Sequence, residues 1–215
     1  MKLTSRSAFT LIELLVVIAI IAILAVVVIL TLNPAELLRQ SRDSNRISDM
    51  ATLKSAITLY ITDQSGVSGF SLGTSGTCYN SPLIATTSFY GPNTSGVWAA
   101  TTSCAAWLVT TTTSSPAVGR SVNGSGWLPV DFASTTSGSP VGTLPMDPLN
   151  TDGTGPSKSA GGFFYSYDTN GTTYKLSAFM ESVKYSTNGA NDVESNSFDG
   201  GNNNYVYEQG SNLAL

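Results

Sequence analysis

An apolar run near the amino end constrains this 215-residue chain more than any other feature. From Leu14 to Leu30, seventeen consecutive residues carry no polar side chain. A helix over residues 9–32 would reach roughly 36 Å at about 1.5 Å per residue, enough to cross a hydrocarbon core of about 30 Å. The run therefore predicts a transmembrane helix. Glu13 places a carboxylate inside it, where a charge is costly and is expected to have a function.

The residues ahead of the helix indicate its orientation. Residues 1–8 contain the cations Lys2 and Arg6 and no acid, which predicts that this end stays in the cytoplasm and the rest lies outside. A secretory signal peptide is one alternative, but its apolar region spans only about 7 to 15 residues and ends at a small-residue cleavage site. A plain uncleaved anchor is another, and it explains everything except Glu13 and the small residues before Phe9.

The start of the apolar run has a specific sequence, with Ala8 followed by Phe9-Thr10-Leu11-Ile12-Glu13. This segment resembles the prepilin leader and N-terminal helix of type IV pilins and type II secretion pseudopilins. In that family a prepilin peptidase cuts before the Phe and methylates the new amino end. The resemblance implies cleavage between Ala8 and Phe9 and N-methylation of Phe9. The family usually has Gly where this chain has Ala8.

Cleavage would give Glu13 a partner. The new α-amino group of Phe9 would be a cation in a low-dielectric setting, which is costly unless it is paired. Our hypothesis is that Glu13 of an incoming subunit neutralises the Phe9 amine of its neighbour as apolar helices pack into a filament. The resemblance implies as partners a homo-oligomeric filament, the prepilin peptidase, the assembly platform and motor proteins, and the cytoplasmic membrane.

A second helical segment is predicted over residues 33–64. Its apolar residues recur at helical spacing on one face, which predicts packing on a sheet of the same chain. These residues are Ile47, Met50, Leu53, Ile57 and Tyr60.

Two local features of this segment carry further expectations. Pro34 predicts a kink, because proline lacks an N–H and clashes with the preceding turn. By resemblance to pilin filaments, the stretch from about Leu32 to Leu37 is expected to be unwound. Downstream, the cations Arg39, Arg42 and Arg46 recur at helical spacing. They predict a solvated face, contacts between subunits or contacts with anionic lipid head groups.

Residues 65–215 are enough for one extracytoplasmic head domain. This head has four cations and nine acids, a charge pattern that argues against a specific nucleic-acid partner. The chain has no His and no nucleophile elbow or phosphate-binding loop, so we expect no enzymatic activity. A paired-carboxylate mechanism stays open in principle, although no spacing selects a pair.

Aromatic and β-branched runs at 163–167, 172–180 and 204–208 predict strands, and Asp168-Thr169-Asn170-Gly171 predicts a hairpin turn. Residues 127–130 predict a shorter strand. The expected fold is α+β, a long N-terminal helix packed on an antiparallel sheet of three or four strands. The Asp147-Pro148 segment and the strands after it loosely resemble the head of major pseudopilins.

Two side-chain sites are predicted in the head. Cys78 and Cys104 lie on the oxidising side of the membrane, which favours a disulfide, with two free thiols as the alternative. Asp192, Glu194 and Asp199 supply the oxygen ligands that Ca²⁺ prefers, in a loop before the last strand. The alternative for this loop is a solvated, turn-rich segment without metal.

Taken together, the sequence predicts four parts. Residues 1–8 form a leader, 9–32 the membrane half of the stem helix, 33–64 its amphipathic half and 65–215 the head. The function expected from the resemblance is that of a structural subunit of a type IV pilus-like or secretion pseudopilus filament, located in the inner membrane and then outside the cell. The alternatives are a minor or tip pilin and a membrane-anchored binding module.

Overall fold

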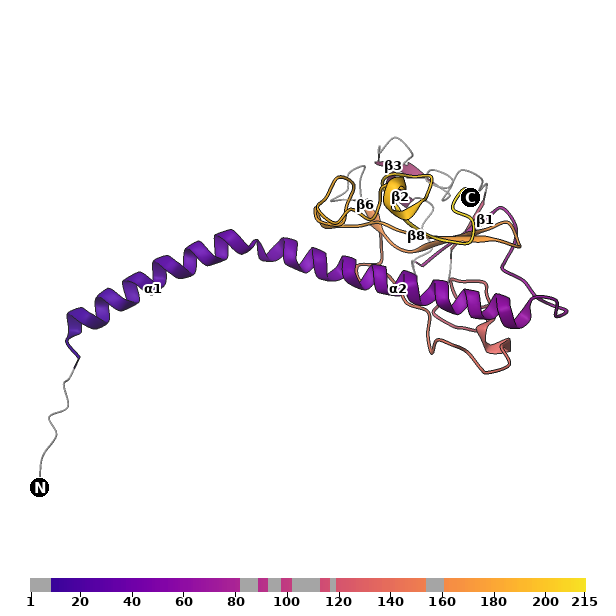
Figure 1. Ribbon diagram of the computed structural model, residues 1–215, viewed down its shortest axis with the longest axis horizontal. Helices are drawn as coiled ribbons and strands as arrows, with labels where there is room; N and C mark the ends of the chain where they lie inside the picture. The colour runs from indigo at the N-terminus through magenta and orange to yellow at the C-terminus, as the bar shows by residue number, and fades with distance from the viewer. Residues whose placement is uncertain (1–8, 82–88, 93–97, 102–112, 117–118, 154–160) are drawn as a thin grey trace, which may run out of the picture. The chain divides into compact units, whose positions relative to one another are not determined.

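The computed structural model describes residues 9–81, 89–92, 98–101, 113–116, 119–153 and 161–215 (Figure 1). The chain forms two compact units, Met1–Leu38 and Arg39–Leu215. The first unit holds helix α1 (Leu11–Leu32) and the first residues of helix α2 (Pro34–Gln64). The second unit holds the rest of α2 and the head.

The residues at its two ends explain where helix α1 begins and ends. Thr10 takes an extended backbone conformation and caps the first turn, and Asn33 takes a left-handed conformation with φ of 39° at the other end. Between them the apolar residues of Leu11–Ile29 are all exposed. A helix that is apolar on every side and exposed in a single chain needs a membrane or other chains around it.

The predicted interruption near Pro34 is present but is shorter than expected. Only Asn33 leaves the helical conformation, and Pro34 starts α2 at the first helical position, where a missing N–H costs nothing. The N–H groups of Glu36 and Leu37 both donate to the Asn33 carbonyl oxygen, at 3.0 and 3.3 Å. These bonds close the first turn of α2, so the single chain is helical from Pro34 onward. Unwinding of the stretch from Leu32 to Leu37 within a filament stays a prediction.

The apolar face predicted for the second helix is confirmed. Met50, Leu53 and Ile57 are completely buried, Tyr60 is almost completely buried and Ile47 is partly buried against them. This face packs on a sheet of the same chain, along which α2 runs (Figure 1).

The main sheet has five strands in the order β4-β1-β7-β8-β9. Their bounds are β1 Thr77–Asn80, β4 Thr113–Pro116, β7 Ser166–Thr169, β8 Tyr174–Ala178 and β9 Tyr207–Gly210. Strands β1, β7, β8 and β9 are antiparallel, which confirms the predicted α+β architecture. Strand β4 adds a parallel edge to β1, and no local sequence pattern predicted this pairing.

The predicted hairpin joins β7 to β8. Gly171 has a φ of 91°, which a turn residue without Cβ adopts at little cost, and Asn170 Oδ1 accepts from the N–H groups of Thr172 and Thr173. The strand expected at 127–130 is absent from the structure. Trp127 lies in an irregular segment and is anchored by donating from Nε1 to the Pro145 carbonyl oxygen.

Two small antiparallel pairs and two short helices complete the described elements. Strand β2 (Phe89–Pro92) pairs with β3 (Trp98–Thr101), and β5 (Thr151–Gly153) pairs with β6 (Gly161–Phe163). The short helices are η2 (Phe132–Ser134) and α3 (Asn196–Asp199).

The two faces of the main sheet differ in chemistry. Tyr167, Tyr174 and Leu176 point to the core shared with α2. Because side chains alternate along a strand, their neighbours lie on the other face. That second face is polar and also buried, and its members include Ser166, Asp168, Lys175, Ser177 and Glu208.

A substitution on α2 tests the packing of the helix on the sheet. We expect Leu53→Ala to lower the free energy of unfolding by about 3 kcal/mol, because it removes a completely buried side chain and leaves a cavity. Leu59→Ala is the matched control, since Leu59 is 44% exposed and should cost less than about 1 kcal/mol. Urea unfolding of the full chain in detergent measures both. Equal losses at the two positions would contradict the packing described above.

Candidate functional site

The start of α1 forms a closed capping box. Thr10 donates from its backbone N and from Oγ1 to Glu13 Oε2, both at 2.8 Å, and the Glu13 N–H donates back to Thr10 Oγ1 at 3.3 Å. Glu13 therefore satisfies N–H groups that the first turn would otherwise leave without a partner. Within a single chain, the carboxylate caps its own helix.

The helix that follows is long and apolar enough to cross a membrane. Leu11–Ile29 has a mean hydropathy of 3.4 and is not buried against the rest of the chain. By length and composition, it is the one such helix in the part of the chain that the structure describes. Phe9, just ahead of it, is also exposed.

Residues 3–29, which include Phe9, Glu13 and most of α1, match the family model of the prokaryotic N-terminal methylation motif. The chain carries a prepilin signal of the type IV pilin and pseudopilin family. No curated protein and no solved structure matches the chain significantly. The prepilin signal confirms the resemblance found in the sequence, and the apolar helix that carries it is consistent with membrane anchoring.

A prepilin signal implies, in general, processing by a prepilin peptidase and assembly into a filament. The cleavage position between Ala8 and Phe9 stays a prediction, because Ala8 lies outside the described residues. N-methylation of Phe9 and the assembly role of Glu13 are likewise predictions.

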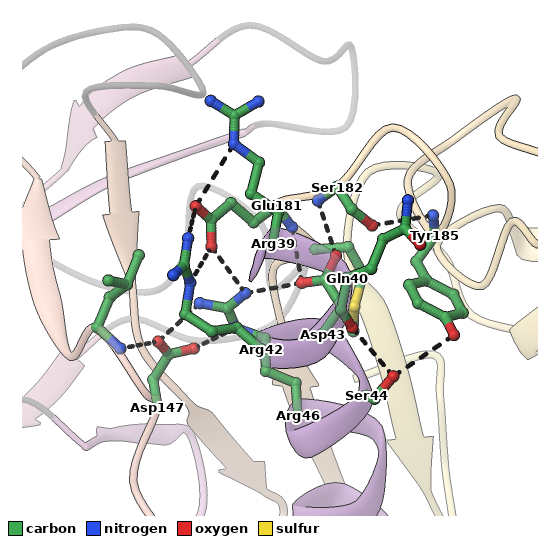
Figure 2. Close-up of polar contacts among 12 residues, drawn as sticks. Arg39, Gln40, Arg42, Asp43, Ser44, Arg46, Asp147, Glu181, Ser182 and Tyr185 are labelled. Atoms are coloured by element: carbon green, nitrogen blue, oxygen red, sulfur yellow. Dashed lines mark hydrogen bonds and ion pairs between the residues drawn. The ribbon is translucent and has the colours of Figure 1, made fainter. Parts of the chain in front are cut away.

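Behind the prepilin signal, charged side chains of α2 meet the head in a buried cluster (Figure 2). Its centre is Arg46, which is completely buried. Arg46 donates from Nε and Nη2 to Asp147, at 2.6 and 2.8 Å, and from Nη1 to Asp43 Oδ1 at 2.7 Å. The Arg46 guanidinium also lies over the Phe163 ring, 4.9 Å from its centroid.

The carboxylates around Arg46 hold two head segments in place. Asp147 Oδ1 accepts from the N–H groups of Leu149 and Asn150, so it caps the loop that follows it. Asp43 accepts from the N–H groups of Glu181 and Ser182, at 2.9 and 2.7 Å (Figure 2). The cluster therefore joins α2 to the segment after β8 and to the 147–150 loop.

Arg42 and Glu181 extend the cluster toward the surface. Arg42 makes a bidentate pair with Glu181, with Nε and Nη2 at 2.7 and 2.5 Å from the carboxylate oxygens, and Arg39 Nε lies 3.7 Å from Glu181. Burial acts to raise the pKa of Glu181, but the hydrogen bonds and the charge of Arg42 lower this pKa below its usual value. Burial acts to lower the pKa of Arg46, but the bonds and charges of Asp147 and Asp43 raise it. Glu181 and Arg46 are therefore ionised at neutral pH.

The expectation of a solvated arginine face is wrong for Arg46, which is completely buried, and Arg42 pairs with Glu181 of the same chain. Arg39 is 45% exposed, and its contacts with other subunits or lipid head groups stay predictions. The burial of Arg46 and Asp43 follows from the same helical face as Met50, because they lie four and seven residues before it. Asp147 and Glu181 were not predicted as their partners, since both are distant in sequence and pair only in the fold.

The three carboxylates predicted to bind calcium lie in the loop between β8 and β9. Asp192 accepts from the N–H groups of Asn188, Glu194 and Ser195. Glu194 accepts from the N–H groups of Met180 and Thr187. Each of these two carboxylates thus organises the backbone of the loop.

Asp199 also accepts from backbone N–H groups, those of Gly201 and Glu208, at 2.8 and 2.9 Å. No group of three or more metal-ligating His, Cys, Asp or Glu side chains occurs among the residues that the structure describes. Calcium binding by Asp192, Glu194 and Asp199 therefore stays a prediction, and the described geometry gives these carboxylates backbone partners.

Asp199 gives this loop a pH dependence. Burial raises the pKa of Asp199 to about 6, although the N–H groups of Gly201 and Glu208 oppose this shift. Because the folded state then binds the proton more tightly than the unfolded chain, Asp199 favours folding at acid pH, and this contribution is lost as the pH rises through about 6. We expect wild type to lose stability as the pH rises from 4 to 7, by no more than about 1 kcal/mol because the group is partly exposed and screened, and Asp199→Asn to lack this pH-dependent loss.

Asp192→Asn is the control of opposite sign. Although burial opposes it, bonds from Ser195 and neighbouring N–H groups lower the pKa of Asp192. Its contribution is therefore present at neutral pH and lost as the pH falls, so Asp192→Asn should lose stability at pH 7. Urea unfolding at intervals from pH 4 to pH 7 measures both variants, and parallel profiles would refute this assignment.

Of the two cysteines in the predicted disulfide, only Cys78 lies among the described residues. Cys78 is completely buried in β1 and is not a free thiol. Cys104 lies outside the described residues, so the pairing of Cys78 with Cys104 stays a prediction.

Proposed function

We propose that this protein is a structural subunit of a type IV pilus-like or type II secretion pseudopilus filament. The observation that carries the proposal is the prepilin signal at residues 3–29, placed on an apolar helix whose residues Leu11–Ile29 are exposed in the described structure. A helix of this kind is suited first to the bilayer and then to packing against copies of itself. The role is therefore assembly and not catalysis.

The life cycle that we propose has three stages. The subunit is inserted with its amino end in the cytoplasm, because residues 1–8 are basic. A prepilin peptidase removes these residues and methylates the new amino end at Phe9. The processed subunit is stored in the inner membrane until assembly platform and motor proteins extract it into an extracytoplasmic filament.

Glu13 has a defined part in this proposal. In the single chain its carboxylate caps α1 through Thr10. The same carboxylate lies one helical turn from Phe9, whose amino group becomes a free cation only after cleavage. Pairing of Glu13 with the Phe9 amine of a neighbour would set the helix register and offset the cost of burying both charges.

The buried cluster around Arg46 supports a mechanical role for the second helix. It joins α2 to two segments of the head through ionic bonds that are shielded from water. A subunit pulled by its stem would transmit force to the head through this connection. The cluster is therefore expected to keep the head attached to α2 during extraction.

Co-expression with a prepilin peptidase, a platform protein and a motor tests the proposed function. We expect electron microscopy to show filaments that contain this chain as their main subunit. Processed chain that appears only at filament ends, in the presence of another main subunit, would indicate a minor pilin. Processed chain that never enters a filament would overturn the proposal.

A further inference from the structure

A buried amine on the polar face of the sheet has no role in the function described above. Lys175, on β8, is completely buried. Its Nζ lies 2.9 Å from Glu208 Oε1, on the neighbouring strand β9, and 3.0 Å from Asn202 Oδ1. It also donates to the backbone oxygen of Leu215. A lysine amine, an asparagine carboxamide and a buried carboxylate thus meet at one point.

The fold holds the backbone of Asn202 against the Glu208 carboxylate. Glu208 Oε2 accepts from the backbone N–H groups of Asn202 and Asn203, at 2.8 and 3.0 Å, while its Oε1 faces Lys175. Gly201 permits this close approach, because a Cβ at position 201 would overlap Glu208 Oε2. Asn202 is thereby fixed beside Lys175 before any reaction, which removes much of the entropic barrier.

We propose that Lys175 and Asn202 become joined by an intramolecular amide bond, with Glu208 as the catalytic acid and base. The site is a candidate for self-modification, in which the substrate is a side chain of the same molecule. No cofactor, oxidant or second protein is required, because amide exchange is neither an oxidation nor a reduction.

The chemistry balances with the three side chains alone. Glu208 Oε1 accepts a proton from the Lys175 ammonium, and the neutral amine attacks Asn202 Cγ to form the new N–C bond. Glu208 then gives a proton to Asn202 Nδ2 and takes one from Lys175 Nζ. The Cγ–Nδ2 bond breaks, the carbonyl re-forms and ammonia leaves. Ammonia finally carries away the remaining proton as ammonium, and Glu208 is again a carboxylate.

Burial keeps bulk water away from the reacting groups. Lys175 and Glu208 are both completely buried, so water does not compete with the amine. The product would link β8 covalently to the loop that precedes β9.

Mass spectrometry of the full chain, purified from membranes in detergent, tests the proposal directly. We expect the intact mass to be one ammonia lower than the sequence of the processed chain requires. A tryptic digest should lack cleavage after Lys175 and should contain a branched peptide that joins Lys175 to Asn202. Lys175→Arg and Glu208→Gln should each restore the full mass, whereas the control Lys184→Arg should keep the loss.

Two results would overturn the proposal. The first is wild-type chain of unshifted mass that trypsin cleaves after Lys175, which needs no variant and is independent of folding defects. The second is an ammonia loss that persists in Lys175→Arg, because this would indicate cyclisation of Asn202 on its own backbone. Circular dichroism of each variant confirms that its head is folded, and neither result depends on whether the chain forms filaments.

Discussion

Replacing Arg46 by methionine is expected to lower the free energy of unfolding by about 3–5 kcal/mol, the largest loss for any single side chain described here. The substitution preserves much of the apolar volume but leaves Asp43 and Asp147 as buried carboxylates without their shared cation. Much of the expected loss is the cost of these uncompensated charges. Urea unfolding of the full chain in detergent, followed by circular dichroism, measures it.

Two further variants separate the charge effect from the loss of packing. Arg39→Met removes a cation of the same helix that is 45% exposed and lies 3.7 Å from Glu181, so it should cost less than about 1 kcal/mol. Adding Asp147→Asn to Arg46→Met should recover part of the loss, because one buried charge is removed. Equal losses for Arg39→Met and Arg46→Met would show that the cluster does not join α2 to the head.

Glu13→Gln is expected to reduce incorporation into filaments by about tenfold or more. A tenfold effect corresponds to about 1.4 kcal/mol, which is less than an unpaired buried charge costs. Glutamine can still take the third position of a capping box, so the variant removes the charge and preserves the cap. Incorporation is measured by immunoblot of sheared filaments from cells that also express the wild-type subunit.

Thr10→Ala is the complementary control for Glu13. It removes the side chain that donates to Glu13 Oε2 and caps the helix, but leaves the carboxylate free to pair with a neighbour. Its incorporation should stay close to that of wild type. If Thr10→Ala assembled poorly and Glu13→Gln assembled normally, Glu13 would act through the helix cap alone.

The parts of the fold that were predicted correctly have strong periodic signals. The apolar stripe from Ile47 to Tyr60 repeats at helical spacing, and the aromatic runs near Tyr167 and Tyr174 alternate as strands do. Each of these patterns is local, so the sequence alone is sufficient. The prepilin signal is likewise a continuous segment, which explains why the family resemblance could be found without a structure.

The parts that were not predicted depend on contacts between distant residues. Arg46 stands in a polar run, and its burial could have been anticipated only by extending the apolar face of α2 back from Met50 to Arg46 and Asp43. Its partner Asp147 is distant in sequence. The oxygen atoms of Asp192 and Glu194 illustrate another limit, because a carboxylate suited to a cation is equally suited to backbone N–H groups.

The amino-terminal peptide of the chain, isolated from membranes that contain an active prepilin peptidase, provides the most direct test of the proposed function. Mass spectrometry should show a chain that begins at Phe9 and carries one methyl group on its α-amine. An amino end that still begins at Met1 under these conditions would contradict the account, because the proposed pairing of Glu13 needs the Phe9 amine that cleavage creates.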